Sequence, residues 1–122
     1  MTEVYFFDSY AVMEILKGNP NYDEFRNKTI ILTKLNLFEI YHSVLYQFGE
    51  GMAEKVYDMY LPYVVEPSDD VIKNAAKLRL EHIKRRLSMA DCIGYVFSLK
   101  AGVKFLTGDK EFEDFDNVEF VK

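Results

Sequence analysis

Short apolar runs alternate with longer helical patterns along the whole 122-residue chain. The runs are rich in Val, Ile, Phe and Tyr, which favour strands, and the segments between them repeat apolar residues at helical spacing. Strands that alternate with helices are typical of a mostly parallel sheet. We therefore expect an α/β fold with five short strands, at Val4–Phe7, Thr29–Thr33, Tyr63–Val65, Lys104–Thr107 and Val118–Val121.

The segments between the runs predict helices with recognisable ends. One stops at Gly18-Asn19-Pro20 and another at Gly49-Glu50-Gly51, where glycine permits the backbone conformation that ends a helix. The longest expected helix begins at Pro67-Ser68, and its apolar stripes continue to Leu87. The other expected helices are Tyr10–Lys17, Leu35–Phe48, Met52–Tyr60 and a nearly all-apolar helix from Ser88 to Gly102.

Length and composition indicate one folded domain over residues 1–122, because 49% hydrophobic residues suffice for a core. The single Cys92 excludes an internal disulfide and a CxxC zinc site. We also expect a cytoplasmic protein without a membrane anchor, because the start has no basic leader and no apolar run approaches membrane-spanning length.

The charge pattern argues against nonspecific coating of nucleic acid. The net charge is -5, whereas that mode of binding needs a broad positive field. Six of the fifteen basic residues nevertheless lie in one short segment: Lys73, Lys77, Arg79, Lys84, Arg85 and Arg86. This segment could guide phosphates, or it could simply be a solvated helix face.

Four acidic residues occupy positions where an unpaired carboxylate is unfavourable. Asp8 and Asp109 follow expected strands, Asp91 opens the apolar helix, and Glu39 lies within a helical segment. The carboxyl ends of parallel strands share one edge of a sheet, so these residues can meet despite their separation in sequence. Two carboxylates about 4 Å apart repel by roughly 4 kcal/mol at an effective dielectric of 20, so a cation must offset them.

Hard oxygen ligands without neighbouring His or Cys at a zinc-like spacing select Mg²⁺ or Mn²⁺. Such an ion can activate water for attack on phosphorus. The structural alternative is that Asp8 and Asp109 cap helices, that Ser88 and Asp91 form a capping box, and that Glu39 faces water. Each cap would contribute only about 1 kcal/mol.

Four segments together resemble the PIN-domain ribonucleases, especially the toxins of VapBC toxin–antitoxin pairs. They are Phe6-Phe7-Asp8-Ser9-Tyr10, Asn36-Leu37-Phe38-Glu39-Ile40, Leu87-Ser88-Met89-Ala90-Asp91-Cys92-Ile93 and Phe105-Leu106-Thr107-Gly108-Asp109-Lys110-Glu111-Phe112. The resemblance spans nearly the whole chain and implies a three-layer α/β/α fold. Asn36 departs from the pattern, because many relatives have Ser or Thr there.

The resemblance implies metal-dependent endoribonuclease activity, with Asp8, Glu39, Asp91 and Asp109 as catalytic metal ligands. It suggests Ser9 and Thr107 as hydroxyl neighbours that orient these ligands. It also makes a small antitoxin and a homodimer plausible partners. Asp114 and Asp116 lie close behind Asp109 and stay outside this set, because a turn rich in Asp needs no explanation beyond solvation.

Among the remaining residues, Arg85 and Arg86 are the candidates for binding substrate phosphates, because they lie just before the Asp91 helix. His42 and His82 fall on or near apolar stripes, which favours packed or surface roles over a catalytic base.

Two alternative functions compete with the ribonuclease hypothesis. One is a non-catalytic protein- or RNA-binding module of the same fold, in which the acids are structural. The other is a phosphoacceptor receiver domain, which the sequence disfavours because the segment Tyr63-Val64-Val65-Glu66-Pro67 offers no Asp at the end of a central strand.

Overall fold

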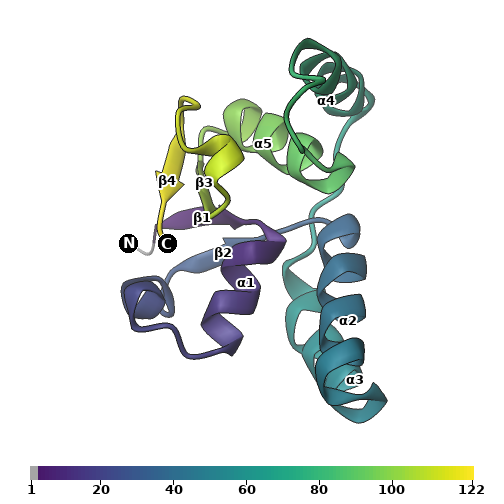
Figure 1. The fold of residues 1–122 in the computed structure, drawn as a ribbon, viewed down its shortest axis with the longest axis vertical. Coiled ribbons are helices and arrows are strands. Elements are labelled where there is room, and N and C mark those ends of the chain that lie inside the picture. The colour runs from purple at the N-terminus through teal and green to yellow at the C-terminus, as the bar shows by residue number, and fades with distance from the viewer. Residues whose placement is uncertain (1–2) are drawn as a thin grey trace.

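Four parallel strands form the centre of the computed structural model, which describes residues 3–122 (Figure 1). They are β1 (Val4–Phe7), β2 (Thr29–Ile31), β3 (Lys104–Thr107) and β4 (Val118–Phe120), in the order β2-β1-β3-β4. Each neighbouring pair is parallel. The expected α/β fold with a parallel sheet is confirmed.

Within residues 3–122, five α-helices and three short 3-10 helices connect and flank the strands. The α-helices are α1 (Ser9–Leu16), α2 (Lys34–Phe48), α3 (Glu50–Tyr60), α4 (Asp69–Glu81) and α5 (Met89–Ala101). The 3-10 helices are η1 (Pro20–Phe25), η2 (Leu61–Tyr63) and η3 (Lys110–Phe112). No helix of the described chain combines the length and the apolar character needed to cross a membrane.

Side chains that alternate along β1 divide the core between the two faces of the sheet. Tyr5 and Phe7 pack in a cluster with residues of α1, α2 and α3, whereas Phe6 packs with Phe105, α4 and α5 on the other side. The chain therefore forms three layers, with the sheet between two groups of helices (Figure 1). This arrangement confirms the α/β/α architecture.

The structure corrects the expected strand at Tyr63–Val65. Leu61 to Tyr63 forms the 3-10 helix η2, and Val64 makes only one isolated parallel bridge, to Leu32. Two features limit the pairing: Pro62 has no N–H to donate, and Thr33 already caps α2 directly after Leu32.

The structure also shortens the helix expected to reach Leu87. Helix α4 ends at Glu81, so with 13 residues it is shorter than α2 with 15. The next residues turn back instead, and Leu87 is buried in the core while its carbonyl accepts a 3.1 Å hydrogen bond from Arg79 Nε. These tertiary contacts outweigh the helical spacing of the apolar residues.

Candidate active site

Asp8 lies at the carboxyl end of β1 and is almost completely buried, at 1% exposure. Its Oδ1 accepts a 2.8 Å hydrogen bond from the Ala11 N–H and thereby caps α1. Its Oδ2 accepts a hydrogen bond from the Thr107 hydroxyl. Asp8 therefore fills the capping role that the sequence allowed, and both of its oxygens face fixed donors.

Asp109 follows β3, the strand beside β1, so the parallel pairing brings it to the same edge of the sheet as Asp8. Its N–H donates a 3.0 Å hydrogen bond to the Thr107 hydroxyl oxygen. Its Oδ1 accepts a 3.0 Å hydrogen bond from the Glu111 N–H at the start of η3. The Thr107 hydroxyl thus connects the Asp8 carboxylate to the backbone that carries Asp109.

Glu39 reaches this edge from the middle of α2 through a contact with α1. The Ser9 hydroxyl donates a 2.6 Å hydrogen bond to Glu39 Oε1, and Asn36 Nδ2 donates a 3.2 Å bond to Ser9 Oγ. Asn36 is itself fixed, because its Oδ1 accepts bonds of 2.9 Å from the backbone N–H and the hydroxyl of Thr33. The amide of Asn36 therefore orients Ser9, and Ser9 orients Glu39.

Asp91 sits in the first turn of α5 and completes the expected capping box with Ser88. The Asp91 N–H donates a 3.0 Å bond to Ser88 Oγ, and the Ser88 N–H donates a 3.4 Å bond to Asp91 Oδ2. The geometry confirms the local helix-start pattern predicted from the sequence.

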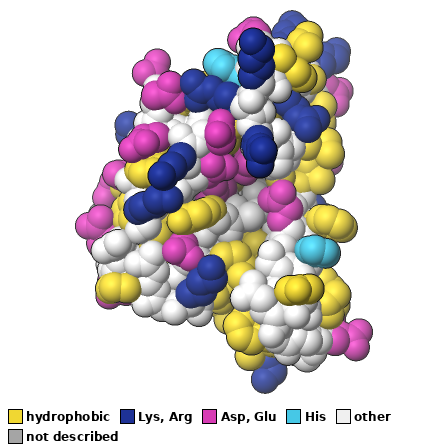
Figure 2. Space-filling model, viewed as in Figure 1, with side chains coloured by type: hydrophobic (Ala, Val, Ile, Leu, Met, Phe, Trp, Pro, Cys, Tyr) yellow, Lys and Arg dark blue, Asp and Glu magenta, His cyan; other side chains and the backbone are white. Residues whose placement is uncertain are grey.

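All four carboxylates line one cavity with a volume of about 610 Å³. Helices α1 and α2 form its walls, and Ser88, Asp91 and Asp109 also line it. Figure 2 shows acidic side chains gathered near the middle of this face, with Lys and Arg side chains around them. The sequence places these four residues in separate segments, and the fold brings them to a common surface.

Burial and mutual repulsion oppose the ionisation of two of these acids. Burial raises the pKa of Asp8 well above its ordinary value, and the nearby Asp91 and Asp109 add to the rise. Burial, and then the charge of Glu39, raise the pKa of Asp91 to about 6. Within residues 3–122, no Lys or Arg forms an ion pair with any of the four acids. Lys17 also lines the cavity, but it pairs with Glu14 and not with any of the four acids.

Some carboxylate oxygens of these acids accept hydrogen bonds from the protein, and others do not. As far as the described residues show, Glu39 Oε2, Asp91 Oδ1 and Asp109 Oδ2 accept no hydrogen bond from the protein. However, no three metal-binding side chains of residues 3–122 lie close enough together to form a ready-made metal group. The donor chemistry suits a hard divalent cation that is bound directly by one or two carboxylates and keeps several of its own waters.

Arg85 and Arg86 differ in their surroundings. The Arg85 guanidinium forms two hydrogen bonds with the Asp114 carboxylate, at 2.9 and 3.0 Å, and a third at 2.7 Å to the Glu111 carbonyl. It also lies 4.9 Å from the centre of the Phe115 ring. Arg86 is exposed. Arg85 is thus engaged by the segment that follows Asp109, whereas the charge of Arg86 faces solvent.

The two histidines also differ in position. His82 packs against Phe115, with ring centres 5.1 Å apart, outside the cavity. His42 is exposed and lines the cavity together with Phe38, one helical turn before it. Phe38 is not among the site residues predicted from the sequence. Its position next to Glu39 was the available signal.

The chain belongs to the PIN domain family, because the family model matches residues 5–118. The fold is similar to that of Mycobacterium tuberculosis VapC20, a Sarcin-Ricin loop cleaving toxin. That match has a TM-score of 0.78 at 16% identity and covers 97% of this chain and 99% of that one. No curated protein matches the sequence significantly.

Two further solved structures are similar over nearly their whole length. VapBC2 from Rickettsia felis, bound to a DNA fragment from its promoter, gives a TM-score of 0.71 at 18% identity, with 98% of this chain and 99% of that chain covered. A toxin–antitoxin complex from Klebsiella pneumoniae gives a TM-score of 0.72 at 15% identity, and the match covers 94% of this chain and 95% of that chain. At these identities the matches establish the shared fold.

Proposed function

We propose that the protein is a Mg²⁺- or Mn²⁺-dependent endoribonuclease and the toxin of a toxin–antitoxin pair. The observation that carries this proposal is the convergence of Asp8, Glu39, Asp91 and Asp109 on one cavity, where no Lys or Arg of residues 3–122 forms an ion pair with them. The similarity in fold to VapC20, described as a Sarcin-Ricin loop cleaving toxin, supports RNA as the substrate.

In this proposal the four carboxylates hold the metal, and Ser9 and Thr107 orient Glu39 and Asp8 through the hydrogen bonds described above. A bound divalent ion supplies activation of water for attack on phosphorus and stabilisation of the leaving oxygen. The protein contributes an edge of the sheet where acidic oxygens are held in fixed positions. A cytoplasmic location, where RNA is available, accords with this function.

The two arginines have different proposed roles. Arg86 is exposed and free to contact a phosphate of the substrate, which would position RNA without selecting its sequence. Arg85 is a weaker candidate for direct substrate contact, because Asp114 and Glu111 already occupy its donors. Any substrate contact by Arg85 would have to replace these bonds.

An antitoxin has a suitable binding groove beside the cavity. An apolar groove of about 230 Å³ lies between α1, α2 and α3, and Met13 and Lys17 line both this groove and the acidic cavity. Its rim includes Phe48, which is 64% exposed. In this proposal an amphipathic helix of the antitoxin binds the groove through its apolar face.

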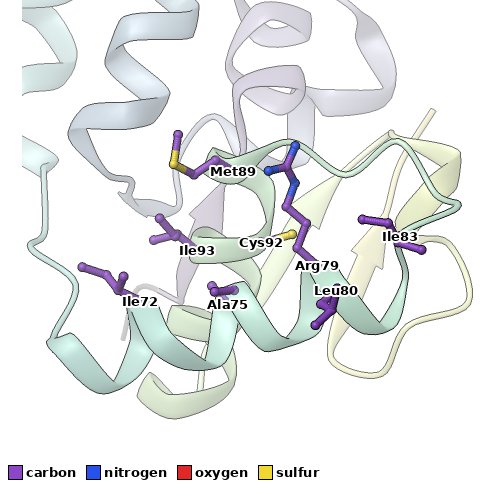
Figure 3. A pocket seen from close by; sticks show the side chains of 9 residues that line it. Ile72, Ala75, Arg79, Leu80, Ile83, Met89, Cys92 and Ile93 are labelled. Atoms are coloured by element: carbon purple, nitrogen blue, oxygen red, sulfur yellow. The ribbon is translucent and has the colours of Figure 1, made fainter.

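A homodimer would use a different surface, the groove of about 340 Å³ between α4 and α5 (Figure 3). Leu80, Ile83 and Met89 at this groove are each more than half exposed, although they are large and apolar. Exposed apolar patches of this kind mark protein interfaces. We propose that a second copy of the chain covers it, and Leu80→Asp should then shift the protein to monomer in light scattering.

RNA cleavage tests the proposed activity directly. The purified protein should cleave single-stranded RNA in Mg²⁺ or Mn²⁺, and cleavage should stop when EDTA removes the metal. Asp8→Asn should abolish cleavage, because the cavity loses its most buried metal ligand while the cap of α1 can be kept by Asn. Asp116→Asn is the matched control, because Asp116 is exposed and outside the cavity.

A non-catalytic binding module is the second candidate. It is favoured by the capping bonds of Asp8, Asp91 and Asp109, which give each acid a structural role. Thermal melting separates the two candidates, because a ligand that binds only the folded state raises the melting temperature. Melting that is unaffected by Mn²⁺, together with no cleavage of varied RNAs, would support the module and refute the nuclease.

A further inference from the structure

Three aromatic side chains form a stripe along the exposed side of α2. Phe38, His42 and Tyr46 follow one another at intervals of four residues, so they lie on one face of the helix. Phe38 is 71% exposed and Tyr46 is 88% exposed. The rings of Phe38 and His42 are nearly parallel, at 12° to each other, with centres 6.4 Å apart. We call these three residues the aromatic stripe.

The face that carries the aromatic stripe differs from an ordinary solvated helix face. Residues 35–48 contain no Lys or Arg, and Glu39 is their only acidic residue. Exposed helix faces usually carry charged side chains, and large aromatic residues are usually at least partly buried. The surface along α2 is therefore suited to a ligand that offers flat, uncharged faces.

The aromatic stripe begins inside the acidic cavity. Phe38 and His42 line the cavity together with Glu39, and so do Ser43 and Gln47 on the same helix. Tyr46 lies one turn beyond His42 and leads away from the acids. The side chains of Ser43 and Gln47 add hydrogen-bonding groups beside the rings, which could contact the edges of bases.

We propose that the aromatic stripe binds unpaired nucleobases of single-stranded RNA next to the phosphate that is cleaved. This proposal rests on the proposed function, because the acidic cavity fixes where the phosphate lies. Bases offer flat π-faces that stack on aromatic side chains with little dependence on sequence. In duplex RNA the bases are already stacked on one another, so the stripe would select single-stranded segments.

A protein partner could also cover an aromatic surface. The cavity position of Phe38 and His42 favours the nucleobase, because both rings share one wall with Glu39. Phe48 provides the comparison. It is also exposed on α2, but it lines the apolar groove with α1 and α3 and not the acidic cavity.

Fluorescence of single-stranded RNA that contains 2-aminopurine tests the stripe, because stacking quenches this base. Binding is measured to the full-length protein in EDTA, where the proposed cleavage is stopped. The wild type should quench the probe, and Phe38→Ala should weaken binding about tenfold, as loss of one stacked base would. Tyr46→Ala should weaken it as well, whereas Phe38→Trp should retain binding.

Phe48→Ala is the matched control and should bind the RNA like the wild type. The corresponding RNA duplex should bind the protein more weakly than the single strand. Phe38→Ala should leave the affinity for the duplex unchanged. The proposal is overturned if Phe38→Ala and Tyr46→Ala bind the single strand like the wild type, or if Phe38→Ala changes only self-association. Since Phe38 is largely exposed, its substitution should leave the melting temperature unchanged.

The cleavage assay separates failure of the stripe from failure of the nuclease. If the wild type cleaves RNA in Mn²⁺ and Phe38→Ala cleaves it with the same KM, the stripe is refuted and the nuclease stands. If quenching depends on Phe38 but no RNA is cleaved with any divalent metal, the proposed activity is refuted and the stripe stands as an RNA-binding surface.

Discussion

The Ser9 hydroxyl donates a 2.6 Å hydrogen bond to the Glu39 carboxylate, although thirty residues separate them in the chain. This contact joins the first residue of α1 to the middle of α2. It holds Glu39 toward the cavity that also contains Asp8. The position of Glu39 therefore depends on the packing of α1 against α2 as well as on the sheet.

Ser9→Ala should weaken Mn²⁺ binding by roughly 10- to 100-fold, because it frees Glu39 to turn away from the other acids. Calorimetric titration with Mn²⁺ measures this change. Ser43→Ala is the control, because Ser43 lines the same cavity and its hydroxyl makes no hydrogen bond to an acid among residues 3–122. Equal affinities for the two variants would argue against an orienting role for Ser9.

The metal-free protein should lose stability as the pH rises from about 4 to above 6, partly because of Asp91. The folded state raises the pKa of this carboxyl from an ordinary value of 3.8 to about 6. In that interval the folded state retains a proton that the unfolded state releases, so the free energy of unfolding falls as pH rises. Above pH 6 the Asp91 contribution is lost.

Urea unfolding in EDTA across this pH range measures the effect. Asp91→Asn should reduce the fall of the unfolding free energy with pH, because Asn does not titrate. The Asn side chain still has an oxygen for the Ser88 cap. Part of the slope should remain, since burial also raises the pKa of Asp8. An unchanged slope in Asp91→Asn would contradict the assignment.

The sequence was sufficient to predict β1 and β3, because each is a short segment of mostly β-favouring residues. The rule that parallel strands end at one edge then placed Asp8 and Asp109 together. The sequence was not sufficient to place Glu39, because its position depends on the bonds that Ser9 of α1 makes with Asn36 and Glu39 of α2. Such contacts join distant segments and leave no local pattern.

The end of α4 shows the same limit. Ile83 and Leu87 continue the helical spacing, but the segment after Glu81 instead folds back to the core and to the C-terminal part of the chain. The bonds of Arg85 to Asp114 stabilise this path. The sequence alone could not distinguish an arginine held by a carboxylate 29 residues away from one that is free to bind RNA.

Arg85→Lys should loosen the segment around Asp114, because lysine cannot reproduce the two parallel hydrogen bonds of the guanidinium. Hydrogen exchange should become faster in residues 109–116, and Arg86→Ala should leave this exchange unchanged. Arg86→Ala should instead reduce the salt dependence of RNA binding. The slope of log affinity against log salt concentration should fall by about the amount expected for one phosphate contact. The opposite pattern would make Arg85 the substrate contact and Arg86 the structural residue.

Gly108→Ala should destabilise the fold by on the order of 3 kcal/mol, because overpacking forces the backbone to shift. A Cβ at this position would overlap the ring of Tyr10 and the carbonyl oxygen of Val121. Gly51→Ala is the control: nothing lies within 4 Å of its Cβ position in α3, so it should not destabilise the protein. Chemical denaturation compares both variants, and similar stabilities would contradict the close packing at Gly108.

The most direct test of the central claim is the anomalous diffraction of crystals soaked in Mn²⁺. We expect a peak in the cavity between Asp8, Glu39, Asp91 and Asp109, with at least two carboxylate oxygens at about 2 to 2.5 Å from the ion. Crystals of Asp8→Asn should lack this peak. A cavity without an anomalous peak at saturating Mn²⁺, or a peak only at other acids, would contradict a shared metal site.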